Sequence, residues 1–229
     1  MDTLVTTFDL AETSLREINS ALHASDLSGE FVIENPAGAH NVAVGLDAEV
    51  KVTIHGHVGY YAAGMNQRAE VTIEGNAGTG VAENMMSGTV WVRGNSSQSA
   101  GATAHGGLLV VDGNAAARCG ISMKGVDIVV GGDVGHMSAF MAQAGRLVVR
   151  GDAGDALGDS IYEARIYLRG NVKSLGADCV AKEMRPEHHE ELSQLLKAGG
   201  YGDDDTNAYT RYGSARSLYH FHADNTASY

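Results

Sequence analysis

The chain has 229 residues, of which 30 are glycine and only two are proline, and its formal net charge is −12. Glycine does not recur at every third residue, which excludes collagen, and the acidic balance disfavours nucleic acid and anionic membranes as partners, because both bind basic surfaces. The first residues lack the basic flank and apolar run of a secretion signal, and no apolar stretch approaches the roughly 18 residues of a membrane span. Cys119 and Cys179 lie 60 positions apart, which gives neither a disulfide framework nor a metal motif. We therefore expect a cytoplasmic protein.

Residues 1–30 are predicted to form an N-terminal helical cap. Between residues 8 and 28 the aliphatic residues recur at helical spacing, and Thr13 or Ser14 is available as the N-cap. These aliphatic residues are Leu10, Leu15, Ile18, Leu22 and Leu27. Such a helix would cover the open end of the structure that follows.

The central part of the chain is an internal repeat of 19 residues. Glycine recurs at this interval without insertion or deletion, at Gly56, Gly75, Gly94, Gly113, Gly132, Gly151 and Gly170. The next residue is Asn or Asp in every case except His57. Glycine followed by Asn or Asp indicates a turn, because these residues tolerate a positive φ best.

Two further columns share this period. The residues four and two positions before each glycine are aliphatic in all seven repeats, from Val52 and Ile54 in the first to Ile166 and Leu168 in the last. Alternation with period two places these pairs on one buried face of a strand. Seven positions after the glycine, every residue is Ala or Gly, which indicates close backbone packing: Ala63, Ala82, Gly101, Gly120, Ala139, Gly158 and Ala177.

Residues 31–182 are therefore predicted to form an all-β domain, a right-handed parallel β-helix (solenoid) of about seven 19-residue coils. A single 19-residue unit cannot close a core, whereas stacked copies pair strand on strand and share one interior. Residues 31–40 keep a trace of the pattern and are expected to form an atypical first coil. Val130 is expected to point inward.

Residues 183–229 are predicted to form a C-terminal helix and a docking tail. Residues 186–198 begin with Pro186 and the acidic Glu187, and end with Lys197 before two glycines, which is the order that a helix favours. The aromatic tail that follows contains Tyr212, Arg216, Tyr219 and Phe221. An exposed tail of this composition would be unusual unless it docks on another surface.

An apolar stripe is expected on the outside of the solenoid. The residue three positions before the repeat glycine points outward, and it changes from Thr53 and Thr72 to Trp91, Val110, Val129, Val148 and Tyr167. A soluble protein seldom leaves such a stripe in water, so either residues 183–229 or another subunit covers it. We favour a partner slightly, because the tail aromatics resemble interface anchors. These five residues, with Tyr212, Arg216, Tyr219 and Phe221, are the predicted partner interface.

The candidate chemical motifs have simpler structural readings. The glycines of segment 75–80 are in phase with the repeat, and no helix follows them, so a phosphate-binding loop is disfavoured. His55 and His57, or His220 and His222, could supply two metal ligands, but the sequence offers no third. Cys119 lies beside the small-residue column, as a core cysteine would. We expect no catalytic, cofactor-binding or metal-binding residue in this chain.

The repeat, with its regularly spaced glycines, resembles the C-terminal (GXGXG) β-helix domain of the large subunit of glutamate synthase. This resemblance covers about residues 31–180. With the tail from Tyr212 to Phe221 included, the chain is similar to stand-alone versions of the domain, such as the small β-helix subunit of methylamine–glutamate N-methyltransferase, also called N-methylglutamate synthase. The resemblance implies a non-catalytic structural subunit of a heteromeric transferase that makes N-methyl-L-glutamate and ammonia from L-glutamate and methylamine.

The same resemblance implies two partners. One is a glutaminase-like, amidotransferase-type subunit, and the other is a synthase-like subunit that carries FMN and an iron–sulfur cluster. The catalytic residues of those domains have no counterparts here, since residue 2 is Asp2 and no cysteines are closely spaced. Two alternatives remain open: a β-helix subunit of another glutamate synthase-like or formylmethanofuran dehydrogenase-type complex, and a stand-alone polysaccharide-active β-helix enzyme. The second alternative lacks the long loops that usually surround the cleft of such enzymes.

Overall fold

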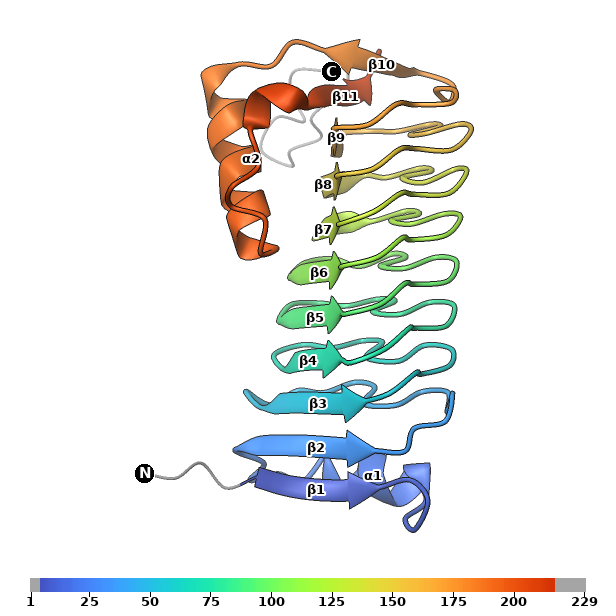
Figure 1. Cartoon of the computed structure of the whole chain (residues 1–229), viewed down its shortest axis with the longest axis vertical. Coiled ribbons are helices and arrows are strands. Elements are labelled where there is room, and N and C mark those ends of the chain that lie inside the picture. Colours follow the sequence, from blue (N-terminus) through green and yellow to red (C-terminus); the bar gives the residue numbers. More distant parts are fainter. Residues whose placement is uncertain (1–4, 217–229) are drawn as a thin grey trace, which may run out of the picture.

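The computed structural model describes residues 5–216 and shows a parallel β-solenoid whose strands form one eleven-stranded sheet (Figure 1). The strand order is β1-β2-β3-β4-β5-β6-β7-β8-β9-β11-β10. The parallel strands are β1 (Val5–Asp9), β2 (Glu30–Glu34), β3 (Lys51–His55), β4 (Glu70–Ile73), β5 (Thr89–Val92), β6 (Leu108–Val111), β7 (Lys124–Val130), β8 (Ala144–Val149) and β9 (Arg165–Leu168). The remaining elements are α1 (Leu15–Ala21), β10 (Cys179–Lys182), α2 (Pro186–Ala198), the 3-10 helix η1 (Thr206–Ala208) and β11 (Thr210–Ser214).

The 19-residue register predicted from the sequence is confirmed. Strands β3 to β9 are paired so that Val52 aligns with Val71, and each later strand follows at the same step as far as Ile166. The two aliphatic residues of every strand are buried, including Val130, which is 0% exposed. A second row of parallel bridges links the residues two positions after each glycine, from Val58 to Val172. Each coil is thus hydrogen-bonded to the next along two of its sides.

The glycine-Asn/Asp pair has a different role from the turn predicted for it. The Asn and Asp residues do not have positive φ; instead each side-chain oxygen accepts a hydrogen bond from the backbone N–H of its counterpart in the next coil, as Asn95 does from Asn114 at 2.8 Å. The ladder contains five such bonds, from Asn76 up to Asn171, and His57 adds a sixth at its start, because its Nδ1 accepts from the N–H of Asn76 at 2.9 Å. The glycine makes room for this side chain. A Cβ at Gly113 would lie 2.5 Å from Asn95 Oδ1.

The choice of residue in the small-residue column is restricted both by the space available and by the backbone conformation. Six of its seven members have positive φ, between 52° at Ala63 and 67° at Gly120. Space is also short, since a Cβ at Gly101 would lie 2.7 Å from Ile128 Cδ1. The positions two before and two after the column are left-handed as well, for example at Tyr61 and Met65. The sequence indicated the close packing but not this left-handed turn.

The N-terminal end differs from the predicted helical cap. Residues 8–28 are not one helix: β1 adds a strand below β2, pairing Phe8 with Ile33, and α1 spans only seven residues. Of the two predicted caps, Ser14 is the one used, and it forms a reciprocal capping box with Glu17. Ile18 and Leu22 are buried in the solenoid core. The end is therefore closed by a strand and a short helix together.

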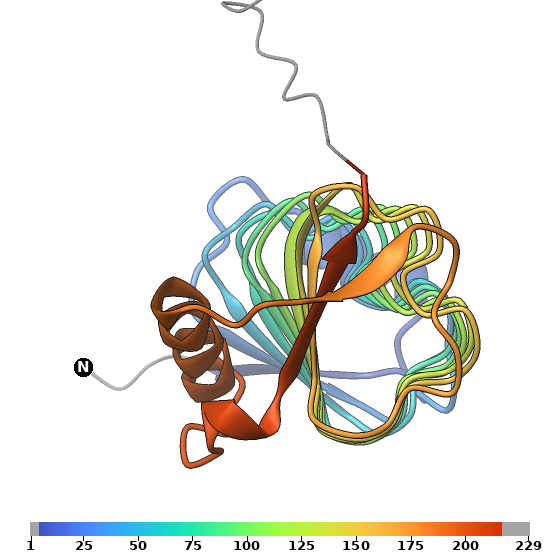
Figure 2. The same ribbon diagram turned by 90° about the horizontal axis from the view of Figure 1, so that it is seen from above.

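The C-terminal end is closed by an antiparallel pair of strands. Helix α2 begins at Pro186 and ends at Ala198, as predicted. The chain then returns as β11, which pairs antiparallel with both β9 and β10. Figure 2 shows β11, in dark red, crossing the end of the solenoid, with α2 on the opposite side of the strands from the loops of the coils. Part of the predicted tail is thus an integral strand.

Val130→Asp should lower the free energy of unfolding by about 3–5 kcal/mol, because it places an unpaired charge in the core. Chemical denaturation followed by circular dichroism measures this loss. Thr72→Asp, at an outward position of β4, is the control and should have a much smaller effect. A Val130→Asp variant that melts within a degree or two of the parent would show that the inward face is assigned wrongly.

Candidate functional site

The predicted outward stripe exists, but the chain itself covers it. Val129, Val148 and Tyr167 are 0% exposed and form a second apolar cluster with residues of the C-terminal region. The residues on the covering side are Leu192, Leu195 and Leu196 of α2 together with Tyr209. The turn after α2 extends the cover, since Gly199 lies against Val129 and Gly200 against Trp91. Only Trp91 remains partly exposed.

Our preference for a partner as the cover of this stripe is therefore corrected. Helix α2 is amphipathic, and its leucines fit an apolar surface that continues over three neighbouring strands. From sequence alone, a stripe covered by α2 and a stripe covered by another subunit look the same. The region from Glu183 to Ser214, which we call the C-terminal cover, leaves Val110, Val129, Val148 and Tyr167 buried without any other chain.

One carboxylate, that of Glu191, fastens the first half of α2 to the solenoid. It accepts hydrogen bonds from Tyr167 Oη at 2.5 Å, Arg165 Nη1 at 2.7 Å and Arg146 Nη1 at 3.1 Å. Burial alone would raise the pKa of Glu191, but these three donors lower it on balance. Burial and the bond to Glu191 raise the pKa of Tyr167, so this phenol stays protonated as a donor. The group is a structural lock and not an acid–base pair.

A second carboxylate, that of Asp204, fastens the turn after α2. Arg150 donates to both of its oxygens, at 2.7 and 2.9 Å, and Tyr209 Oη donates at 2.7 Å. The hydrogen bond from Arg150 holds the pKa of Asp204 below its usual value. The Arg150 guanidinium also stacks 3.9 Å from the ring centre of Tyr201. A bidentate, partly buried pair of this kind is among the stronger ion pairs that proteins make.

Asp112 joins the cover to the uncovered end of the stripe. Its Oδ1 accepts from Trp91 Nε1 at 2.9 Å and from Tyr201 Oη at 3.1 Å. On the solvent side, Arg93 lies 4.1 Å from the ring centre of Trp91. Asp112 directly precedes the repeat glycine Gly113, and its carboxylate here helps to hold the cover.

The other predicted interface residues are placed apart from the stripe. Tyr212 is 8% exposed and packs into the core from β11, so it is a closing residue of the solenoid. Arg216 is exposed and pairs with Asp178. Tyr219 and Phe221 lie outside the described residues, as do His220 and His222. The structure therefore brings together only the five stripe residues.

The candidate chemical residues are occupied with structural contacts. His55 Nδ1 lies 2.7 Å from Glu34 Oε1, while His57 takes part in the Asn ladder. Burial raises the pKa of Cys119 to about 12, so this thiol is not a nucleophile. Within residues 5–216, no three His, Cys, Asp or Glu side chains come together to hold a metal ion, and no helix there has the length and apolarity needed to span a membrane.

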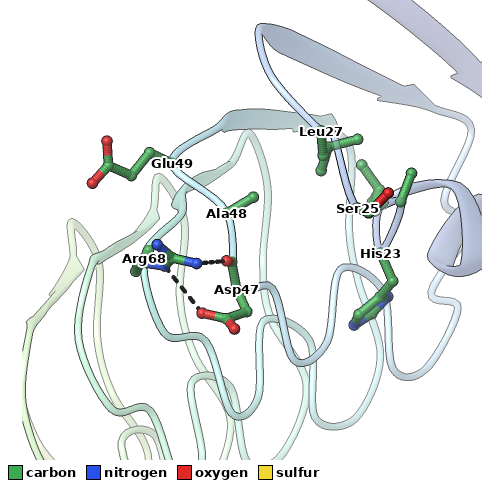
Figure 3. A pocket seen from close by; sticks show the side chains of 9 residues that line it. His23, Ser25, Leu27, Asp47, Ala48, Glu49 and Arg68 are labelled. Atoms are coloured by element: carbon green, nitrogen blue, oxygen red, sulfur yellow. Dashed lines mark hydrogen bonds and ion pairs between the residues drawn. The ribbon is translucent and has the colours of Figure 1, made fainter.

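A polar pocket of about 530 Å³ lies between the end of α1 and the first coils (Figure 3). Arg68 donates to the Asp47 carboxylate at 3.0 Å, so the central charges neutralise each other, while Glu49 points away from them (Figure 3). Both ring nitrogens of His23 face backbone carbonyls, those of Asn19 and Gly45. These contacts tie α1 to the coils and provide no nucleophile–base pair.

Exposed apolar side chains occur elsewhere on the solenoid. Tyr60, Tyr61 and Met65 of the first repeat are 52%, 46% and 54% exposed, and His40 stacks on Tyr60 with ring centres 4.5 Å apart. Tyr61 and Met65 have positive φ, so their side chains project from the left-handed turn. Sequence reasoning missed this patch because it treated the turn as a column of small residues. The next repeat does carry a signal for the left-handed turn, since the positions of Tyr61 and Met65 are occupied there by Gly80 and Asn84, residue types that tolerate a positive φ.

The fold and contacts define a parallel β-solenoid with a built-in C-terminal cover. No family model matches the chain. Protein GlxC of Rhizobium meliloti (strain 1021) is 60% identical over 226 residues, which cover 96% of this chain and 98% of that protein. At this identity and coverage, the chain belongs to the GlxC family.

Glu191→Gln should loosen the C-terminal cover, because it removes the charge that compensates Arg165 and weakens three hydrogen bonds. We expect a loss of about 1–3 kcal/mol of unfolding free energy and faster trypsin cleavage within residues 183–211. Glu190→Gln is the matched control, since Glu190 is exposed and, within residues 5–216, its side chain accepts a hydrogen bond only from Gln194 of the same helix. Equal cleavage of the two variants would contradict the role of Glu191.

Proposed function

We propose that this chain is the non-catalytic solenoid subunit of a glutamate synthase-like heteromeric enzyme. The observation that carries the proposal is the unbroken 19-residue step from β3 to β9, with no inserted loops that could enclose a substrate. This coil pattern resembles the β-helix domain of the glutamate synthase large subunit. In that setting the solenoid is a rigid spacer that holds catalytic subunits at fixed positions.

The particular enzyme that we propose is methylamine–glutamate N-methyltransferase, which makes N-methyl-L-glutamate and ammonia from L-glutamate and methylamine. Its other subunits would be an amidotransferase-type chain and a synthase-like chain that carries FMN and an iron–sulfur cluster. We assign the chemistry to those partners, because no three metal-ligating side chains come together within residues 5–216 and burial raises the pKa of the Cys119 thiol to about 12.

The patch of Tyr60, Tyr61 and Met65 supports a role in assembly. These side chains are about half exposed, whereas the stripe is already covered. The ring centres of Tyr60 and Tyr61 lie 6.4 Å apart, and exposed tyrosine and methionine side chains are enriched at protein interfaces. In the proposed complex, a catalytic subunit would cover this patch.

The test is purification of the complex from the source cells through an affinity tag on this chain. We expect an amidotransferase-type and a flavin-containing iron–sulfur subunit to co-purify, and N-methylglutamate formation to require both. Tyr61→Lys should reduce their recovery several-fold. Ser99→Lys is the matched control, because it adds the same charge at the same left-handed position two coils further on. Recovery of the chain alone, or flavin that stays with the isolated chain, would contradict the proposal.

A further inference from the structure

A carboxylate adjoins the exposed tyrosines of the first repeat. A Cβ at Gly80 would lie 2.6 Å from Tyr61 Cδ1 and 2.7 Å from Glu83 Oε2, so the ring and the carboxylate lie against the same glycine. The backbone N–H of Met65 donates to the Glu83 carbonyl at 2.8 Å, which places the methionine at the same turn. The planes of the Tyr60 and Tyr61 rings are inclined at 77° to each other. The Glu83 carboxylate therefore belongs to the surface that the two half-exposed rings form.

This carboxylate is not compensated within residues 5–216, the part of the chain that the structure describes. Glu83 is half-buried, and there its side chain has neither a hydrogen-bond donor nor a cation as a partner. Burial raises the pKa of Glu83, and no neighbouring group opposes this shift. Burial acts in the same direction on Glu191, but three hydrogen bonds outweigh it and lower the pKa of that carboxyl. A cation supplied by another molecule would relieve the cost of the uncompensated charge.

The chain shows elsewhere which group is missing. In two places it combines an aromatic ring, an arginine that lies over the ring and a carboxylate that binds the arginine. These groups are Trp91–Arg93–Asp112 and Tyr201–Arg150–Asp204. The guanidinium carbons lie 4.1 and 3.9 Å from the two ring centres. Tyr61 and Glu83 provide the ring and the carboxylate of a third such group, but no arginine or lysine within residues 5–216 lies over the ring of Tyr60 or Tyr61.

We propose that this surface binds an arginine side chain of a partner subunit, with the guanidinium on the Glu83 carboxylate and against the Tyr61 ring. Arginine fits better than lysine, because its planar guanidinium is weakly hydrated, stacks on aromatic rings and binds a carboxylate through two N–H groups. Tyr60 and Tyr61 are about half exposed, as expected where a protein surface presents the cation. The net charge of −12 also favours a partner with a basic surface. The inference rests on the proposed function, because it names the type of residue with which a catalytic subunit would cover this patch.

The first measurement uses the full chain with isotope-labelled tyrosine, and the probe is the peptide acetyl-Gly-Arg-Gly-amide. NMR spectra should show saturable shifts of the Tyr60 and Tyr61 ring signals, assigned with Tyr60→Phe and Tyr61→Phe. The same peptide with citrulline, which keeps the shape of arginine without its charge, should produce shifts about fivefold smaller or less at equal concentration. Glu83→Gln should weaken binding of the arginine peptide about fivefold or more, because the charge-assisted pair is lost. Glu70→Gln, which removes an exposed carboxylate paired with Lys51, is the matched control.

The second measurement is the recovery of other subunits through an affinity tag on this chain. Glu83→Gln should lower the recovery several-fold relative to both the parent and Glu70→Gln. Equal recovery by Glu83→Gln and the parent would overturn this inference and leave the proposed function intact. A parent chain that recovers no subunit would instead overturn the proposed function, and with it the partner named here.

The third measurement needs no ligand. Because the Glu83 charge is uncompensated in the free chain, Glu83→Gln should keep or raise the melting temperature at neutral pH. Any gain should disappear at low pH, where the carboxyl of the parent is protonated as well. A lower melting temperature at neutral pH would show that the carboxylate has a structural partner, and would overturn the proposal.

The remaining outcomes are equally decisive. Absent shifts with the arginine peptide, equal shifts with the citrulline peptide, or binding that Glu83→Gln leaves unchanged would overturn the proposal. Self-association of the free chain that Glu83→Gln abolishes would place a second copy on this surface, and would overturn the assignment to a partner subunit.

Discussion

The stacking of coils of equal length is the constraint on which the rest of the structure depends. From β3 to β9 the aliphatic pairs repeat every 19 residues, so the backbone of each strand finds its counterpart one coil away, apart from a register shift between Lys124 and Asp127 of β7. The Asn/Asp ladder adds a side-chain bond at each step, and the glycine beside it leaves the space that this side chain needs. The spacing changes at the N-terminal end, where β2 lies 25 residues after β1 and β3 lies 21 residues after β2 in the register.

This constraint explains why the middle of the fold could be predicted and the ends could not. Inward residues such as Ile54 and Val130 follow from the alternation within a strict repeat, and α2 follows from Pro186 and Lys197 at its ends. Strand β11 has no repeat to indicate it, since it pairs only in antiparallel order, with β9 residues more than 40 positions earlier and with β10 residues 29 to 35 positions earlier. The helix predicted for residues 8–28 was wrong where Phe8 extends the sheet.

The candidate site likewise has one part that could be predicted from the sequence and one part that could not. The stripe from Trp91 to Tyr167 was visible in the sequence as a column, but its cover was not, because Leu192 and Leu196 could equally face a partner. The locking carboxylates, Glu191 and Asp204, look like ordinary surface acids in the sequence. Only the three-dimensional placement of Arg146, Arg150 and Arg165 gives them their role. The left-handed turn that exposes Tyr61 was likewise hidden by the variety of residues that occupy it.

The most direct test of the stacking account is the stability of Gly113→Ala relative to Gly202→Ala. An added Cβ at Gly113 would lie 2.5 Å from Asn95 Oδ1 and 2.8 Å from the carbonyl oxygen of Gly94, whereas at Gly202 the nearest atom is 3.6 Å away. Chemical denaturation should show that Gly113→Ala is less stable by about 1–3 kcal/mol, while Gly202→Ala is close to the parent. Equal stability of the two variants would contradict the claim that close packing of equal coils holds this protein together.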